Sequence, residues 1–298
     1  MRTYVAFSHS IITSFSFSIL LTLPLLLFPP PHPPPHPPPP PPHPCLNVVT
    51  SLSMLRLPAV SETWMTDEVP LIIHHTAPAD KSRWAPLWHD CRESFYTNFP
   101  ESSGYKHVMW NDDDIDTFVR EVSPDFYSSI YQKYARNIQR IDVVRYFIMF
   151  MIGGIYADMD VLCYKNFHHL LPPGKASIAE SSHEGEAYQN ALMASPAHHP
   201  FWHYVFMDVL FQSSRCIDPN NEFLDTIERT GPSVIIRAVE AAPAMMFNAL
   251  PKAMFMPSNA VHRVASSLDE LKYKPSESEK DSVYAYHVGT GHWGGTLA

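Results

Sequence analysis

The chain has 298 residues, of which 45% are hydrophobic and 17% are charged, so it holds enough apolar material for a sizeable core. Asp and Glu outnumber Lys and Arg by 30 to 21, which gives a net charge of −9. We expect no nucleic-acid partner, because such binding needs clustered positive charge. Four cysteines without a Cys-x-x-Cys pair are too few for a scaffold built on disulfides.

The N-terminal part of the chain carries no Asp, Glu, Lys or Arg between Arg2 and Arg56. Residues 11–28 are mostly apolar, and a run of this length is near the lower limit for a helix that crosses a bilayer. An uncleaved anchor is favoured because no small-x-small cleavage site follows Phe28, while a cleaved signal peptide and a misassigned gene start stay open. We therefore predict a signal anchor or signal peptide in residues 1–28.

A proline-rich segment follows this apolar run. Residues 29–44 contain only proline and histidine, a composition that adopts polyproline II and forms no core. Such a run is a stiff spacer. We predict that residues 29–68 are a stalk or linker, and that one globular domain occupies residues 69–298.

Helical and strand patterns alternate from Val69 onward. Short apolar runs predict buried strands, and apolar side chains at helical spacing predict helices. The predicted elements are a strand at 69–74, a helix at 82–97 with Ser82 as N-cap, a strand at 105–110, and a short helix capped by Asn111. Asp112, Asp113 and Asp114 then lie in a first helical turn, where acidic groups favour the helix dipole, so we do not predict a metal site there.

The most hydrophobic helix is predicted at residues 138–152, where Gly153-Gly154 ends it. Ile155–Ala157 then reads as a central strand with Asp158 and Asp160 at its exit. Alternating helices and strands predict an α/β fold, with a mostly parallel sheet covered on both faces. Ligands bind such sheets at the carboxyl ends of the strands, which is where the two carboxylates fall.

The Asp158-Met159-Asp160 tripeptide is the strongest chemical signal in the chain. Carboxylates at i and i+2 on extended chain point the same way, and hard oxygen ligands suit Mg²⁺ or Mn²⁺. Asp142 and Arg145 lie on one face of the apolar helix. An ion pair within the helix would explain them, but so would a polar cavity that binds sugar hydroxyls.

These residues belong to a longer pattern, which resembles the signature of family 32 glycosyltransferases, including Golgi α-mannosyltransferases and inositol phosphoceramide mannosyltransferases. The central segment of the pattern is Arg140-x-Asp142-x-x-Arg145-Tyr146 followed by Gly153-Gly154-Ile155-Tyr156-x-Asp158-x-Asp160. Further matches are Pro70–Thr76, Trp110-x-Asp112, the segment from Asn190 to Phe201, Thr230-Gly231-Pro232, and His287 with His292-Trp293. The family usually has Ser where this chain has His292, which puts the fine coordination of a metal in doubt.

The resemblance implies a GT-A type nucleotide-diphospho-sugar transferase fold and sugar transfer with retention, most often from GDP-mannose. It implies Asp160 as a direct ligand of Mn²⁺ or Mg²⁺, Asp158 as a water-mediated metal or donor contact, and His287 as a third metal contact. Asp142, Arg145, Asn190 and His74 would bind the donor, although Asn190 could equally be a helix cap. Asp142, Arg145, Asp158 and Asp160 are the expected catalytic residues.

The acceptor would be a glycan or glycolipid, and the N-terminal segment would hold a lumenal, single-pass type II protein in the Golgi or endoplasmic reticulum membrane. A partner subunit stays open. Two alternatives remain: a UDP-sugar donor that supplies galactose, glucose or N-acetylglucosamine, and an inactive carbohydrate-binding relative.

Overall fold

The computed structural model describes residues 67–215, 217, 221–261 and 265–291. The predicted anchor at 1–28, nearly all of the predicted linker at 29–68, and His292 lie outside the described residues. All described residues belong to one compact unit, Arg56–Ala298. Among them, no helix is both long and apolar enough to cross a membrane.

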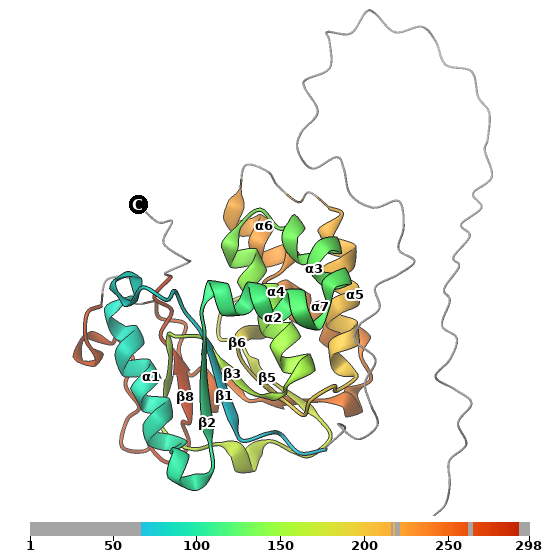
Figure 1. Ribbon diagram of the computed structural model, residues 1–298. Coiled ribbons are helices and arrows are strands. Elements are labelled where there is room, and N and C mark those ends of the chain that lie inside the picture. Colours follow the sequence, from blue (N-terminus) through green and yellow to red (C-terminus); the bar gives the residue numbers. More distant parts are fainter. Residues whose placement is uncertain (1–66, 216, 218–220, 262–264, 292–298) are drawn as a thin grey trace, which may run out of the picture. The chain divides into compact units, whose positions relative to one another are not determined.

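A six-stranded sheet with the order β2-β1-β3-β6-β5-β7 forms the centre of this unit (Figure 1). Its strands β1, β2 and β3 are parallel, β6 runs antiparallel to both β3 and β5, and β7 is parallel to β5. All strands except β6 therefore run in one direction, and the predicted mostly parallel sheet is confirmed. The strands are β1 (Ile72–Thr76), β2 (Lys106–Trp110), β3 (Gly154–Ala157), β5 (Ala176–Glu180), β6 (Tyr188–Ser195) and β7 (Phe247–Leu250).

A second, two-stranded antiparallel sheet joins β4 (Val161–Cys163) to β8 (Ala285–His287). The sequence did not predict it, because each strand has only three residues and the partners lie more than 120 positions apart. This pairing brings His287 beside Val161, one residue after the Asp-x-Asp tripeptide.

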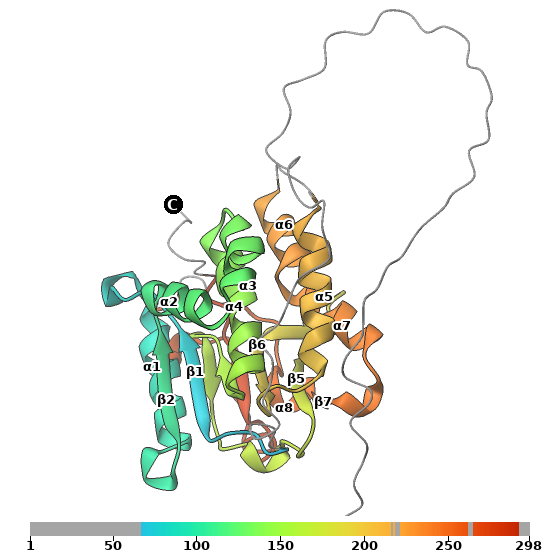
Figure 2. The same ribbon diagram turned by 45° about the vertical axis from the view of Figure 1, so that its right-hand side comes forward.

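Helices cover both faces of the sheet, as predicted (Figure 2). Helix α4 packs on β3 and β6, and α7 also packs on β6, whereas α1 packs on β4 and α8 packs on β5 and β8. The helices are α1 (Pro86–Asn98), α2 (Asp112–Val122), α3 (Pro124–Ser129), α4 (Asn137–Met151), α5 (Phe201–Ser213), α6 (Glu222–Arg229), α7 (Pro232–Ala241) and α8 (Lys252–Phe255).

Most of the predicted elements appear with shifted ends. The first strand begins at Ile72 rather than Val69, and α1 begins at Pro86 because a 3-10 turn, Lys81–Arg83, precedes it. Ser82 is therefore not the N-cap that we predicted; Asp80 caps the 3-10 turn instead. The predicted cap at Asn111 is confirmed, because its side chain accepts from the backbone N–H groups of the first turn of α2.

Gly153 and Gly154 direct the chain from α4 into β3. Both have positive φ, and a Cβ at Gly153 would lie 2.5 Å from the backbone nitrogen of Ala197. Only glycine fits this close approach without strain. The Nε2 of His74 bonds to the carbonyl oxygen of Gly153 at 2.9 Å, so β1 also fixes the start of β3, the strand just before Asp158.

Two buried histidines on β1 support the same region. His75 Nδ1 bonds to the carbonyl oxygen of Ala157 at 2.8 Å, and burial lowers the pKa of His75 to about 3 and that of His74 to about 4. A neutral His75 can donate from Nδ1, and its other ring nitrogen, Nε2, is buried without a partner among the described residues. Protonation of His75 would place a positive charge in this buried region.

We expect His75 to make the fold less stable at acidic pH. The unfolded chain binds a proton at His75 below its ordinary pKa of 6.5, and the folded chain does so only near 3, so stability falls as pH falls through this window. Relative to His75→Gln, the wild type should lose about 2 kcal/mol of unfolding free energy between pH 7 and pH 5. Urea titrations of both proteins at each pH measure this difference, and parallel pH profiles would contradict it.

Candidate active site

A cavity of about 400 Å³ opens where β1 and β3 end. Strand β1 leads into Thr76 and Ala77, and β3 leads into Asp158. Helices α4 and α6 supply further walls, and so does the segment after β8. The cavity therefore lies at the carboxyl ends of parallel strands, where the sequence predicted a ligand site.

Asp160 lies in the turn between β3 and β4 and is held by the segment after β8. Its Oδ2 accepts from the backbone N–H of Thr290 at 2.8 Å and from the hydroxyl of Thr290 at 3.0 Å. Its Oδ1 lies 3.2 Å from Nε2 of His287. Burial would raise the pKa of Asp160, but His287 and the Thr290 hydrogen bonds outweigh burial and lower this pKa to about 2. The carboxylate is therefore ionised across the physiological range.

Asp158 has hydrogen-bond partners different from those of Asp160. Tyr156 donates its hydroxyl to Oδ1 of Asp158 at 2.7 Å, and Nη1 of Arg145 donates to Oδ2 at 2.9 Å. Burial raises the pKa of Asp158, although Arg145 acts against this shift. The guanidinium group of Arg145 also lies 5.0 Å above the ring of Tyr156, so it is fixed by both groups.

Arg145 and Asp142 form the floor of the cavity, deep in α4. Nη2 of Arg145 lies 3.1 Å from Oδ1 of Asp142, and both side chains are buried. Asn190 and Thr230 donate to the two oxygens of Asp142 at 3.1 Å and 3.0 Å. Burial raises the pKa of Asp142 to about 6, in spite of the nearby Arg145. The network links α4, β6 and the end of α6 into one polar cluster.

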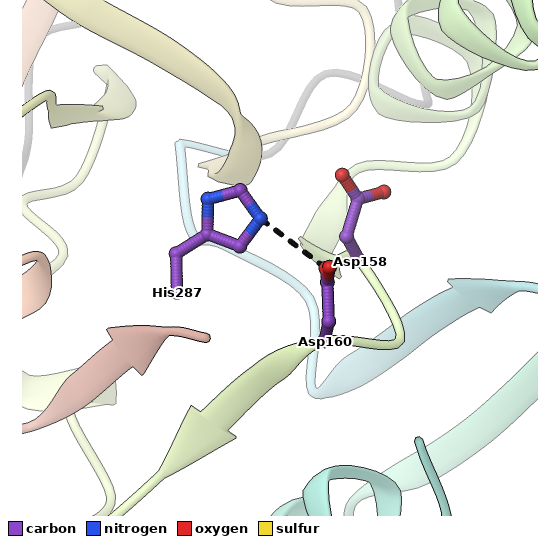
Figure 3. A group of neighbouring side chains, drawn as sticks. All are labelled: Asp158, Asp160 and His287. Carbon is purple, nitrogen blue, oxygen red and sulfur yellow. Dashed lines mark ion pairs between the residues drawn. The ribbon is translucent and has the colours of Figure 1, made fainter. Parts of the chain in front are cut away.

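Asp158, Asp160 and His287 form the candidate metal site (Figure 3). Each offers one ligand atom, and these atoms lie within 4.8 Å of one another. Two carboxylates and one imidazole suit Mn²⁺ or Mg²⁺, and the open cavity leaves room for substrate oxygens. Burial would lower the pKa of His287, but Asp160 outweighs this and raises it. A bound cation would take the place of that proton, so these residues fit the ion.

Six of the seven predicted site residues line this cavity: Asp142, Arg145, Asp158, Asp160, Asn190 and His287. The helix-cap alternative for Asn190 is wrong, because this residue lies within β6. The structure does not bring His74 to the cavity: it is fully buried, and its ring bonds to Gly153 and Trp110. We therefore no longer expect a direct contact between His74 and a donor.

The sequence reasoning missed Thr290, and it gave Tyr156 no role of its own. Thr290 donates both its backbone N–H and its hydroxyl to one Asp160 oxygen, and Trp88 in α1 donates to the Thr290 hydroxyl at 3.1 Å. No local pattern marks these residues, because the contacts span 130 and 202 positions. Only the pairing of β8 with β4 brings them together.

We expect Thr290→Val to weaken metal binding, whereas Thr290→Ser should not. Valine keeps the shape and the backbone N–H but loses the hydroxyl that orients Asp160, and loss of such a supporting contact costs about 10-fold to 100-fold in metal affinity. Titration of Mn²⁺ against tryptophan fluorescence measures the affinity of each variant. Equal affinities for the Val and Ser variants would show that the hydroxyl does not orient Asp160.

The comparisons with known proteins agree with this geometry. Residues 79–177 match the family described as glycosyltransferase sugar-binding region containing DXD motif. Inositol phosphoceramide mannosyltransferase 1 of Schizosaccharomyces pombe is 31% identical over 45% of this chain and 41% of its own length. Mannosyl phosphorylinositol ceramide synthase CSH1 of Saccharomyces cerevisiae is 30% identical over 56% of this chain and 41% of its own length. The chain thus spans about two-fifths of these curated relatives.

Among solved structures, the PaToxG glycosyltransferase is 16% identical, with a TM-score of 0.42, over 59% of this chain and 71% of that one. The sheet order, with one antiparallel strand and the Asp-x-Asp turn after β3, agrees with the α/β fold and mostly parallel sheet predicted from the sequence. The matched region contains Asp142, Arg145 and the Asp-x-Asp tripeptide. Residues 79–177 of this chain therefore resemble the sugar-binding region of the DXD-containing glycosyltransferases.

Proposed function

We propose that the chain is a metal-dependent glycosyltransferase that moves a sugar from a nucleotide diphosphate to an acceptor hydroxyl. One observation carries the proposal: the Asp158, Asp160 and His287 cluster shares its cavity with Asp142, Arg145 and Asn190. The first set suits a divalent cation and the second suits sugar hydroxyls. A nucleotide sugar contains both a diphosphate and a sugar, and so needs both sets.

The roles of the residues follow from their contacts. Asp160 and His287 would hold Mn²⁺ or Mg²⁺, which would stabilise the negative charge that develops on the departing nucleoside diphosphate. Arg145 lines the cavity and would orient the sugar as a planar donor, while its Nη1 and Nη2 also hold Asp158 and Asp142. Asp142 would accept from a sugar hydroxyl, and Asn190 fixes the direction of that carboxylate.

We infer that the donor is GDP-mannose, because relatives that match the chain are named as mannosyltransferases. Their names also mention inositol phosphoceramide, which supports a glycolipid or glycan as acceptor. A UDP-sugar donor would fit the same cluster, and an assay with several nucleotide sugars decides between the two donors. The predicted membrane attachment, the lumenal Golgi location and the partner subunit stay proposals, and the attachment rests on residues 1–28.

We infer a retaining reaction without a covalent sugar–enzyme intermediate. Both oxygens of Asp158 and both oxygens of Asp142 already accept hydrogen bonds from protein groups. A carboxylate held in this way is a poor nucleophile. With the retention that the family resemblance implies, the acceptor hydroxyl would then attack from the face that the diphosphate leaves, and its proton would pass to a departing phosphate oxygen.

The experiment is to incubate the full chain with a panel of nucleotide sugars and to measure nucleoside diphosphate release. We expect release from GDP-mannose with Mn²⁺, and loss of release when EDTA removes the cation. Release from a UDP-sugar alone would overturn the mannosyl assignment and keep the enzyme class. A chain that binds a nucleotide sugar in the presence of Mn²⁺, yet releases nothing even when candidate acceptors are supplied, would instead be an inactive sugar-binding relative.

A further inference from the structure

Trp88 in α1 is linked to the metal cluster by two hydrogen bonds, and the roles proposed above do not use it. Its Nε1 donates to the Thr290 hydroxyl at 3.1 Å, and that hydroxyl lies 3.0 Å from Oδ2 of Asp160. The side chains of Trp88 and Thr290 are both buried. Helix α1 is therefore connected to Asp160 through an interior that leaves little room for water.

The chemistry of the three groups fixes the direction of both hydrogen bonds. An indole N–H can only donate, and an ionised carboxylate can only accept. The Thr290 hydroxyl has one hydrogen, so it accepts from Trp88 and donates to Asp160. The indole occupies one lone pair of the hydroxyl oxygen and thereby limits how the hydroxyl can rotate. Trp88 thus directs the hydrogen that Asp160 receives.

The same hydrogen bonds determine which oxygen of Asp160 is left for a cation. Oδ2 accepts from both the backbone N–H and the hydroxyl of Thr290, whereas Oδ1 faces Nε2 of His287 at 3.2 Å. A cation in the cluster would therefore meet Oδ1 of a carboxylate that is already held through Oδ2. A ligand that is fixed in advance loses less conformational freedom when the cation binds.

Packing keeps the Trp88 indole in the place that these bonds need. Trp88 belongs to a buried apolar cluster that also contains Trp84 and Met159. Met159 is the residue between the two carboxylates of the Asp-x-Asp tripeptide. The start of α1 and the tripeptide therefore share one apolar core, and a displacement of the indole from the tripeptide would disturb this packing.

We propose that Trp88 is a positioning residue of the metal cluster: its N–H orients the Thr290 hydroxyl, which holds Asp160 ready for a divalent cation. The inference rests on the metal site of the proposed function, and it adds a residue of α1 that acts on Asp160 only through Thr290. The role belongs to the indole N–H and not to the apolar ring. Loss of the N–H alone should therefore weaken cation binding.

The test is Trp88→Phe, which keeps an aromatic ring and removes the N–H. Mn²⁺ alone is titrated into the full chain, and the electron paramagnetic resonance signal of free Mn²⁺ gives the affinity. We expect Trp88→Phe to bind Mn²⁺ about threefold to tenfold more weakly than the wild type, the net value of one hydrogen bond. The KM for Mn²⁺ in sugar transfer should rise by the same factor, and kcat at saturating Mn²⁺ should stay within about twofold.

Trp84→Phe is the matched control. Trp84 lies in the same apolar cluster, and its Nε1 donates to the carbonyl oxygen of Pro78 at 2.8 Å rather than to Thr290. This variant makes the same change of ring and should keep its Mn²⁺ affinity within about twofold. Equal losses of affinity in the two variants would overturn the proposal, because they would trace the effect to packing. Unchanged affinity in Trp88→Phe would overturn it as well.

A double variant tests whether Trp88 acts through the Thr290 hydroxyl. In a Thr290→Val background the indole N–H has no hydroxyl to orient, so adding Trp88→Phe should not weaken Mn²⁺ binding further. In a Thr290→Ser background the hydroxyl is kept, and Trp88→Phe should cost the same factor as in the wild type. A loss that persists in the Val background would show that Trp88 acts by another route.

Failure of the proposed function has a different signature. If the wild type binds no Mn²⁺, with or without GDP, the metal site is wrong and the role of Trp88 is wrong with it. If Mn²⁺ binds and depends on Trp88 and Thr290 as expected, but no nucleotide sugar is turned over, the positioning role stands and the proposed transferase activity fails.

Discussion

Asp160→Asn is expected to lower kcat/KM for the sugar transfer by at least about 100-fold, the size of effect seen when a group that stabilises transition-state charge is removed. Asn keeps the size of the side chain and can still accept from Thr290, but it presents a neutral group toward His287. Without the negative charge, the cluster has one carboxylate fewer for a divalent cation. Mn²⁺ affinity and turnover should fall together.

The matched comparison is Asp158→Asn. Both oxygens of Asp158 are already engaged by Tyr156 and Arg145, so this change should lower turnover with a smaller loss of Mn²⁺ affinity. Calorimetric titration of Mn²⁺, together with initial rates at saturating Mn²⁺, separates the two variants. If Asp160→Asn kept wild-type affinity while Asp158→Asn lost it, the assignment of Asp160 as the direct ligand would be wrong.

The sequence predicted the part of the fold that local patterns encode. The helix that ends at Gly153-Gly154 and the strand before Asp158 appear within one or two residues of the predicted ends, because apolar periodicity and glycine punctuation act over short distances. Our prediction put the N-terminal end of α1 four residues too early, and the reason is again local. Pro86 fits the first turn of a helix and Asp80 caps an earlier 3-10 turn, so Ser82 had no helix to cap.

The candidate site was predictable only where its residues share a local segment or a resemblance to a known family. Asp142, Arg145, Asp158 and Asp160 lie within 19 positions of one another. Thr290 donates to Asp160 and Trp88 donates to Thr290, although these residues lie far apart in the sequence, and no local pattern predicts either contact. His74 shows the opposite error: its segment fits the resemblance, but β1 is buried on both faces, so the side chain of His74 lies in the interior.

Arg145→Met is expected to destabilise the fold by about 3–5 kcal/mol, which is the cost of removing one partner from a buried ion pair. Methionine fills much of the same space, yet it leaves the buried carboxylate of Asp142 and the partly buried carboxylate of Asp158 without their cation. Arg145 holds down the pKa values of both groups, so both should rise further in the variant. Chemical denaturation at pH 7 measures the loss, and turnover should also fall because the sugar loses its planar donor.

Adding Asp142→Asn to Arg145→Met shows whether the loss of stability comes from the broken ion pair or from poorer packing. Asp142→Asn keeps the shape and removes one of the two charges that Arg145 neutralises, so Arg145→Met with Asp142→Asn should be more stable than the sum of the single changes predicts. The coupling free energy should reach about 1–3 kcal/mol, as for contacting residues in one network. Additive losses would mean that the ion pair contributes little and that packing of the Arg145 side chain dominates. The same double variant should remain inactive, because the cavity floor would then have neither the donor nor the acceptor proposed to hold the sugar.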